Sequence, residues 1–323
     1  MLQVQNLTVK FLSDKDENEV VKDISFTLKK NKILGIVGES GSGKSVTSLA
    51  VLGLLPKNTI QEGTIFFDEK NLLTISNKEF QQIRGNKIAM IFQEPMSSLN
   101  PTLTCGSQVA EVLKQHTDLN KKEIYQEVIS LFQKVKLPLP DRIFNSYPHQ
   151  ISGGQKQRVM IAIAIACKPD LLIADEPTTA LDVTIQAQIL EILEKSAREL
   201  NVAVLLITHD LGVVAGICDR VAVMYGGRIV EEAPVDDLFE RPLMPYTWGL
   251  MKSIPQMDKS TTSRLYTIPG SPPVMSRPPK GCAFAARCEF AIDKCQTEVP
   301  ELETYAAGRL VRCHRVNEPT FVK

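Results

Sequence analysis

The sequence has no long hydrophobic run and no excess of charge of either sign. Its longest apolar segments, 159–167 and 202–207, are much shorter than the roughly 20 residues that a membrane-spanning helix needs. Residues 1–11 alternate apolar and polar side chains as a strand does, without the basic start and apolar block of a secretion signal. Lysine plus arginine number 37, as do aspartate plus glutamate. We therefore expect a chain that does not span a membrane by itself and binds no nucleic acid through bulk positive charge.

A glycine-rich segment, GESGSGKS at 38–45, matches the pattern G-x-x-x-x-G-K-[ST]. The apolar run 33–37 before it suits a buried strand, and 45–55 is expected to form a helix that stops at Pro56. Glycines let backbone N–H groups turn toward phosphate oxygens, and the lysine and serine suit the β- and γ-phosphates and Mg²⁺. The predicted nucleotide-binding residues are Gly38, Glu39, Ser40, Gly41, Ser42, Gly43, Lys44, Ser45 and Val46, with Ser45 as a Mg²⁺ ligand.

Two further apolar strands end in polar side chains. Residues 171–174 are all apolar and are followed by Asp175 and Glu176, at the strand end where α/β sheets bind ligands. Acids there are costly unless a cation or a reaction uses them, so we expect Asp175 to hold Mg²⁺ and Glu176 to polarise the attacking water. The apolar strand 202–207 is followed by His209, which is expected to contact the γ-phosphate.

A second anion-binding segment precedes a helix rich in alanine and isoleucine. Ser152 is a plausible N-cap, and the following glycines expose backbone N–H groups at the positive end of the helix. The sequence therefore predicts contacts to a second γ-phosphate if two such subunits meet head to tail. The residues concerned are Ser152, Gly153, Gly154 and Gln155.

These segments together resemble the motifs of the ABC-type ATPases. They occur in the family's order, with Gln93 in MIFQEP, ISGGQ at 151–155 and TTALD at 178–182, and only Ile151 departs from the usual leucine. The resemblance covers about 1–240. It implies an α/β P-loop core with a mostly parallel sheet and flanking helices, and a helical subdomain at about 95–160. It also implies that two subunits enclose two ATP molecules.

The resemblance also implies roles for individual residues. Gln93 would sense Mg²⁺ and the attacking water, Asp182 would face the partner subunit, and Phe11 would stack on adenine, although a core phenylalanine is the alternative. The stretch 95–104 is expected to be an exposed loop that meets the membrane subunits, or else a plain surface loop. The implied catalytic residues are Lys44, Gln93, Glu176 and His209, and the implied Mg²⁺ ligands are Ser45, Gln93 and Asp175.

Three kinds of protein could carry these motifs: a transporter ATPase, a soluble ABC ATPase, and an inactive nucleotide fold with a metal-binding module. A DNA-repair ATPase would need long heptads between residues 45 and 152, and none are present. A translation ATPase would usually carry two cassettes, and only one phosphate loop is found. An inactive fold would be expected to have lost at least one of the catalytic motifs.

From about residue 241 the composition changes, and prolines between 269 and 279 predict an extended connector. PYTWGLMKSIP, IPGSPP and GCAFAARC in 241–323 resemble the C-terminal extension of ATPase subunits of the oligopeptide, dipeptide and nickel importers. The resemblance implies peptide import, with nickel or another small ligand as the alternative. It also implies a second, non-identical ATPase, two membrane permease subunits and an extracytoplasmic binding protein, with this chain peripheral on the cytoplasmic face of the membrane.

Four cysteines lie in this tail, Cys282, Cys288, Cys295 and Cys313, with the spacing C-x5-C-x6-C-x17-C. Disulfides are rare in reducing compartments, and the spacing matches neither zinc fingers nor bacterial ferredoxins. From the residues alone, one tetrahedral metal site or four reduced thiols are both open. The resemblance favours a 4Fe–4S cluster, with zinc as the alternative. A small proline-rich tail would need such a cross-link to hold its fold.

Overall fold

The computed structural model describes residues 1–13, 17–93, 98–178, 182–254, 266–276, 278–306 and 308–318. Part of the predicted loop 95–104 and part of TTALD therefore lie outside the described residues. The chain forms two compact units. The first comprises Met1, Leu28–Ile33 and Thr74–Ile207, and the second comprises Leu2–Thr27, Leu34–Leu73 and Thr208–Lys323.

Three parallel strands form the sheet of the first unit. They are β6 (Ile88–Ile91), β7 (Leu171–Asp175) and β8 (Ala203–Thr208), with β7 in the middle. Every residue of β7 and β8 is buried, which explains why both were visible as continuous apolar runs. The strands end at Asp175 and Thr208, so Glu176 and His209 stand just beyond them.

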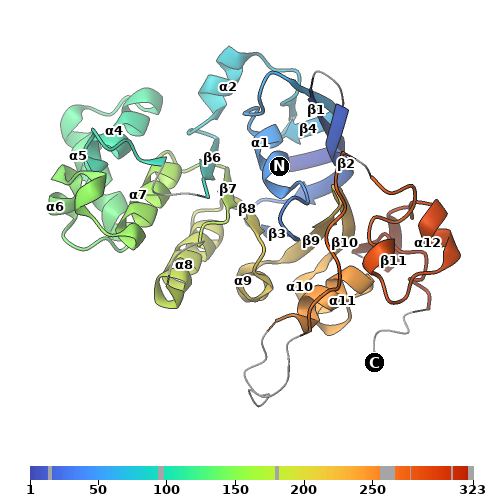
Figure 1. Ribbon diagram of the computed structural model, residues 1–323. Helices are drawn as coiled ribbons and strands as arrows, with labels where there is room; N and C mark the ends of the chain where they lie inside the picture. The colour runs from blue at the N-terminus through green and yellow to red at the C-terminus, as the bar shows by residue number, and fades with distance from the viewer. Residues whose placement is uncertain are drawn as a thin grey trace. The chain divides into compact units, whose positions relative to one another are not determined.

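The helices of the first unit are α2 (Asn77–Ile83), α4 (Cys105–His116), α5 (Lys121–Lys134), α6 (Pro140–Asn145), the 3-10 turn η1 (Pro148–Gln150), α7 (Gly153–Ile165) and α8 (Val183–Glu199). Helices α4 to α7 pack on one another and appear as one green group in Figure 1. The ring of Phe144 lies against Gly106, where an added Cβ would come within 2.2 Å of it. Glycine therefore lets α4 and α6 approach closely.

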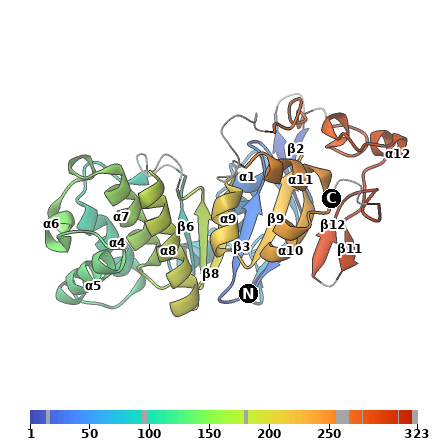
Figure 2. The ribbon, with the colours of Figure 1, turned by 90° about the horizontal axis from the view of Figure 1, so that it is seen from below.

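The second unit contains a sheet in the order β2-β1-β4-β5, in which the pairs β1–β4 and β4–β5 are antiparallel. Its strands are β1 (Leu2–Leu12), β2 (Glu17–Leu28), β4 (Thr59–Phe67) and β5 (Lys70–Asn71). A second group of strands runs in the order β11-β12-β10-β9-β3: β3 (Ile33–Val37), β9 (Arg220–Tyr225), β10 (Arg228–Pro234), β11 (Glu303–Ala306) and β12 (Arg309–Val311). Strands β3 and β9 are parallel, and Figure 2 shows them side by side. The pairs β9–β10, β10–β12 and β12–β11 are antiparallel.

The helices of the second unit are α1 (Lys44–Val51), α9 (Leu211–Ile217), α10 (Val235–Glu240), α11 (Pro245–Lys252), the 3-10 turn η2 (Ala285–Arg287) and α12 (Asp293–Thr297). Helix α1 is shorter than predicted, because it ends at Val51 and not at Leu55. Gly53 has a φ of 59°. The N–H of Leu54 donates to the carbonyl of Leu49 at 2.9 Å. A left-handed glycine closes the helix one turn early.

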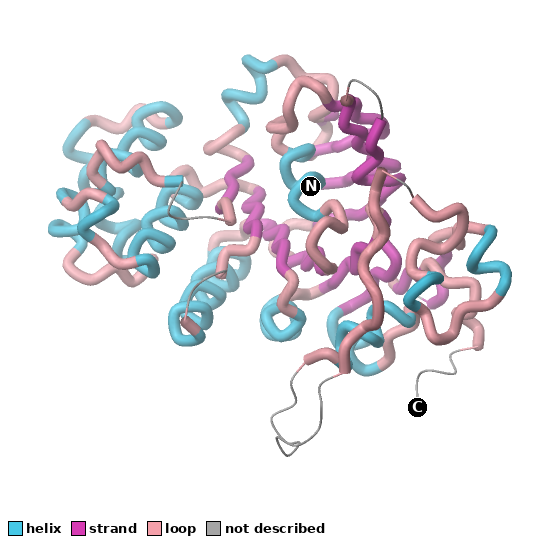
Figure 3. The backbone as a smooth tube through the Cα atoms, in the orientation of Figure 1, coloured by secondary structure: helices cyan, strands magenta, loops and turns pink. Residues whose placement is uncertain are grey.

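The C-terminal extension is fastened to β10. Strand β12 of the extension pairs with β10. The buried carboxylate of Glu231, in β10, accepts hydrogen bonds from the N–H groups of Leu243 (2.8 Å) and Met244 (3.0 Å) and from the guanidinium of Arg309 (3.2 Å). Burial raises the pKa of Glu231, and these donors oppose that rise. In Figure 3 most of the described extension is loop, and residues 266–276 of the predicted connector contain no helix or strand. No helix among the described residues is long and apolar enough to cross a membrane.

Candidate nucleotide site and cysteine segment

The predicted phosphate loop joins β3 to α1 within the second unit. All of β3 is buried, and the loop turns where Gly38, Gly41 and Gly43 have φ values of 154°, 78° and 100°. A Cβ on Gly38 would lie 2.2 Å from the carbonyl oxygen of Met224. Gly41 has open space, so only its dihedral angle favours glycine. The loop therefore exposes backbone N–H groups at the start of a helix, as a phosphate site requires.

Lys44 is buried at the start of α1, and its ammonium group lies inside the loop. It donates to the carbonyl oxygens of Gly38 (2.7 Å) and Glu39 (3.0 Å). Ser42 is also buried, and its hydroxyl makes no hydrogen bond within the described part of the chain. Ser40 is exposed, while Ser45 and Val46 are half-buried. A charged donor and an unsatisfied hydroxyl in one glycine-lined loop fit an anion with several oxygens.

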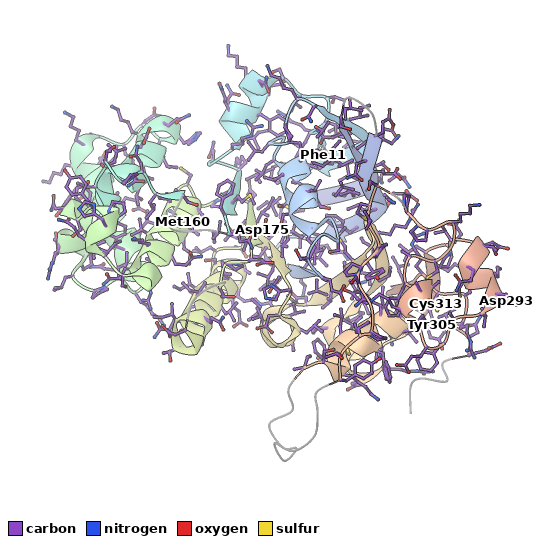
Figure 4. The ribbon with its side chains drawn as sticks, viewed as in Figure 1. Phe11, Met160, Asp175, Asp293, Tyr305 and Cys313 are labelled. Carbon is purple, nitrogen blue, oxygen red and sulfur yellow. The ribbon has the colours of Figure 1, made fainter. Side chains whose placement is uncertain are left out.

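Two predicted catalytic residues of the first unit are in contact. The amide of Gln93 donates to a carboxylate oxygen of Glu176 at 2.9 Å. Glu176 has a φ of 45° and donates its N–H to the carbonyl of Ile207 at 2.8 Å. A glutamate in this left-handed region is strained, and such strain is common at functional sites. Asp175, labelled in Figure 4, is 4% exposed at the end of β7. Buried carboxylates suit Mg²⁺, which prefers oxygen ligands.

The second predicted anion segment begins α7. Ser152 caps the helix: its hydroxyl accepts from the N–H of Gln155 (3.3 Å), whose side chain accepts from the N–H of Ser152 (3.0 Å). Ser152 and Gly153 are exposed, and Gly154 and Gln155 are half-buried. A Cβ on Gly153 would meet nothing within 4 Å, whereas one on Gly154 would lie 3.2 Å from Ile185. Packing within the chain therefore gives no reason for glycine at 153.

Three further predicted nucleotide residues are Asp182, His209 and Phe11. Asp182 is exposed and caps α8 by accepting from the N–H of Ile185 at 2.9 Å. His209 is exposed and belongs to the second unit. Phe11, labelled in Figure 4, lies near the end of β1 opposite Thr59, with its side chain half-buried. Phe11 is not among the buried core residues, and its stacking on adenine stays a prediction.

Sequence reasoning missed one buried residue beside the site. Gln157, on α7, is 1% exposed and donates to the carbonyl of Pro177 at 2.7 Å. It therefore ties the helix that follows the second anion segment to the chain just after Glu176. A glutamine in a helix carries no distinctive pattern, and only its place two residues after Gln155 could have drawn attention to it.

None of the seven cysteines forms a disulfide, and the four of the tail lie in the second unit, with Cys313 labelled in Figure 4. Burial raises the pKa of Cys288 and of Cys313 to about 11, and neighbouring cysteines add to the rise. The other three tail cysteines each raise the pKa of Cys313, so the four thiols interact electrostatically. Among the described residues, no three His, Cys, Asp or Glu side chains are grouped closely enough to hold a metal ion.

Comparison with known proteins identifies the chain's relatives. Residues 21–179 match the ABC transporter family, and residues 230–295 match the oligopeptide/dipeptide transporter C-terminal region. The chain is 49% identical over 320 residues to the oligopeptide transport ATP-binding protein AppD of Bacillus subtilis, covering 98% of this chain and 97% of that protein. The chain belongs to the ABC transporter ATP-binding proteins. The expected family is thus confirmed.

Other relatives of this ABC transporter ATPase agree. The dipeptide transport ATP-binding protein DppD of Bacillus subtilis is 48% identical over 315 residues, which are 97% of this chain and 94% of that protein. A solved dimeric ATP-binding cassette in a post-hydrolysis state, bound to ADP and Pi, has a TM-score of 0.66 and 28% identity. It covers 73% of this chain and 99% of the cassette. The predicted α/β ATPase fold is confirmed, and the chain is an ATPase.

Proposed function

We propose that this ABC ATPase powers the import of oligopeptides or dipeptides across a membrane by hydrolysing ATP. The observation that carries the proposal is the extent of the similarity. Relatives named for oligopeptide and dipeptide transport match 97–98% of the chain, including the C-terminal region that a bare cassette would lack. We assign the ATPase domain to 1–240, with its helical part at about 95–160, and the extension to 241–323.

The proposed reaction transfers the γ-phosphoryl group of ATP to water. Lys44 binds the β- and γ-phosphates, and Ser45 and Asp175 hold the Mg²⁺ that offsets their charge. Glu176 takes the proton of the attacking water, and the hydrogen bond from Gln93 keeps its carboxylate oriented for that step. His209 positions the γ-phosphate. The products are ADP, phosphate and a proton first carried by Glu176.

We further propose that a second ATPase subunit completes the ATP site of this chain. In return, Ser152, Gly153, Gly154 and Gln155 would contact the partner's ATP. The open space at Gly153 supports this, because a bare backbone there leaves room for a phosphate from outside the chain. A dimeric cassette among the related structures supports it too. Two membrane permease subunits and an extracytoplasmic binding protein would complete the importer, with this chain peripheral on the cytoplasmic face.

The test of the catalytic assignment is Glu176→Gln in the assembled transporter. We expect ATP binding to persist and turnover to fall by at least about a hundredfold, because the proton acceptor is lost. Glu199→Gln, at the exposed end of α8, is the matched control and should leave turnover unchanged. Uptake of labelled di- and oligopeptides, compared with nickel, tests the substrate. ATP-dependent nickel uptake without peptide uptake would reject the peptide assignment.

We also propose that the tail thiols hold a 4Fe–4S cluster, through Cys282, Cys288, Cys295 and Cys313. Four free thiols that interact electrostatically in one small segment fit such a group. In such a cluster each thiolate would bind a different iron. When bound, the cluster would cross-link the tail.

Anaerobic purification followed by iron, sulfide and zinc analysis tests this proposal. We expect about four irons and four sulfides per chain, and their loss in Cys282→Ser. The control is Cys167→Ser, which changes a cysteine just beyond α7 and outside the tail, and it should keep the metal. Zinc alone would replace the cluster with a single-ion site. Absence of iron and zinc would mean that the four thiols are free.

A further inference from the structure

Glu39, the second residue of the phosphate loop, is held by side chains of the C-terminal extension. Its carboxylate accepts two hydrogen bonds from the guanidinium of Arg287, at 2.8 and 3.1 Å. Its backbone N–H donates to the hydroxyl of Tyr246 at 2.9 Å. All three residues belong to the second unit. The loop and the extension are therefore joined by a bidentate ion pair and a backbone contact.

Arg287 is placed to make a strong contact. Its side chain is 6% exposed, and its remaining donors reach the carbonyl of Pro269 (2.8 Å) and the hydroxyl of Tyr225 (3.1 Å). Tyr225, Tyr246 and Phe284 pack as an aromatic group beside it, with centroids 4.4–5.4 Å apart. A buried guanidinium with fixed partners is rigid, and loss of its carboxylate would leave an uncompensated charge.

The peptide groups around Glu39 are fixed from two sides. Lys44 uses two of its three N–H donors on the carbonyls of Gly38 and Glu39, and in the proposed site the same ammonium also binds phosphate. Arg287 binds the carboxylate of Glu39 and Tyr246 accepts from its N–H, so neither competes with Lys44, which binds its carbonyl. We infer that Arg287 and Tyr246 are positioning residues for ATP binding, because they hold the Glu39 segment independently of Lys44. The inference rests on the proposed nucleotide role of this loop.

The position of Arg287 in the chain links the cysteine segment to the phosphate loop. It lies in η2, between Cys282 and Cys288, and directly precedes the latter. Order in the cysteine segment therefore supports the geometry of the phosphate loop. Loss of that order would act on ATP affinity through Arg287, without any change in the loop's own sequence.

A double-mutant cycle on the full chain tests the inference. Arg287→Gln and Glu39→Gln should each raise the Kd for MgATP by about tenfold, which corresponds to about 1.4 kcal/mol. The double variant should also raise the Kd by no more than about tenfold, since both changes break the same contact. In the assembled transporter the KM for ATP should rise while kcat stays within about twofold, a split that general loss of fold would not produce.

Controls separate positioning from folding. Arg315→Gln changes another arginine of the cysteine segment, which bonds to Phe290 and Glu318 and makes no described contact with the loop, and should leave the Kd unchanged. If Arg287→Gln does not fold, Tyr246→Phe removes only the hydroxyl and should raise the Kd by about threefold. Unchanged affinity in the folded variants, or additive effects in the cycle, would overturn the inference alone. Failure of the unaltered chain to bind MgATP would overturn the proposed function, and this inference with it.

Discussion

Gly153 offers a test in which stability and activity should move in opposite directions. Nothing lies within 4 Å of an added Cβ, and the residue begins α7 without a left-handed dihedral angle. Alanine there should stabilise the isolated chain by about 0.5 kcal/mol, because it removes backbone freedom from the unfolded state. For a chain of this size the expected rise in Tm is about 1–2 °C.

In the assembled transporter the same methyl group would face the partner's bound ATP. Overpacking costs about 1–3 kcal/mol, so ATPase turnover should fall roughly 5- to 150-fold while the isolated chain still binds ATP normally. Calorimetric unfolding and phosphate release measure the two effects. Gly216→Ala, at another open and exposed position in α9, should give a similar stability change without loss of turnover. Full ATPase activity in Gly153→Ala would refute the reasoning that a phosphate approaches this backbone.

Two further outcomes follow from the geometry. Gly38→Ala should abolish ATP binding, because its Cβ would lie 2.2 Å from the carbonyl oxygen of Met224. Urea unfolding should show a free energy of unfolding lowered by about 2 kcal/mol. The carboxylate of Glu191 accepts hydrogen bonds from Lys136 and Lys195, which hold its pKa at about 2. A lowered pKa means that these ion pairs stabilise the fold above the ordinary carboxyl pKa, and that their contribution is lost as the pH falls toward about 2. An NMR titration of Glu191 should therefore have its midpoint near 2, and Lys195→Gln should move the midpoint upward; an ordinary midpoint would contradict the ion pairs.

The sequence predicted the parts of the site that depend on local pattern. Strands buried on both faces appear as apolar runs, so β7, β8 and the acids Asp175 and Glu176 could be predicted from the sequence alone. The end of α1 was misplaced because Pro56 suggested a later stop than the left-handed Gly53 imposes. A proline is an obvious helix breaker, while a glycine's dihedral angle depends on how the following turn closes.

Local sequence pattern does not predict contacts between residues that are far apart in the chain. Gln93 and Glu176 were expected to share a site through resemblance, but no local pattern predicts their hydrogen bond. Gln157 was missed because its function in the fold depends on a carbonyl twenty residues away. A buried amide must find a partner, yet helical periodicity specifies only the side of the helix on which it lies.

The pairing of Arg287 with Glu39 is the contact that local pattern could predict least, since the two residues are 248 positions apart. Each stands in a recognisable segment, but Glu39 occupies a variable position of the glycine-rich pattern and Arg287 stands between cysteines that attract a metal interpretation. Physical chemistry requires a buried guanidinium to have an anionic or carbonyl partner, without specifying which one. The division of the sequence near residue 240 is therefore not a division of the nucleotide site. A side chain from beyond that boundary holds the phosphate loop, so the extension and ATP binding should be altered together.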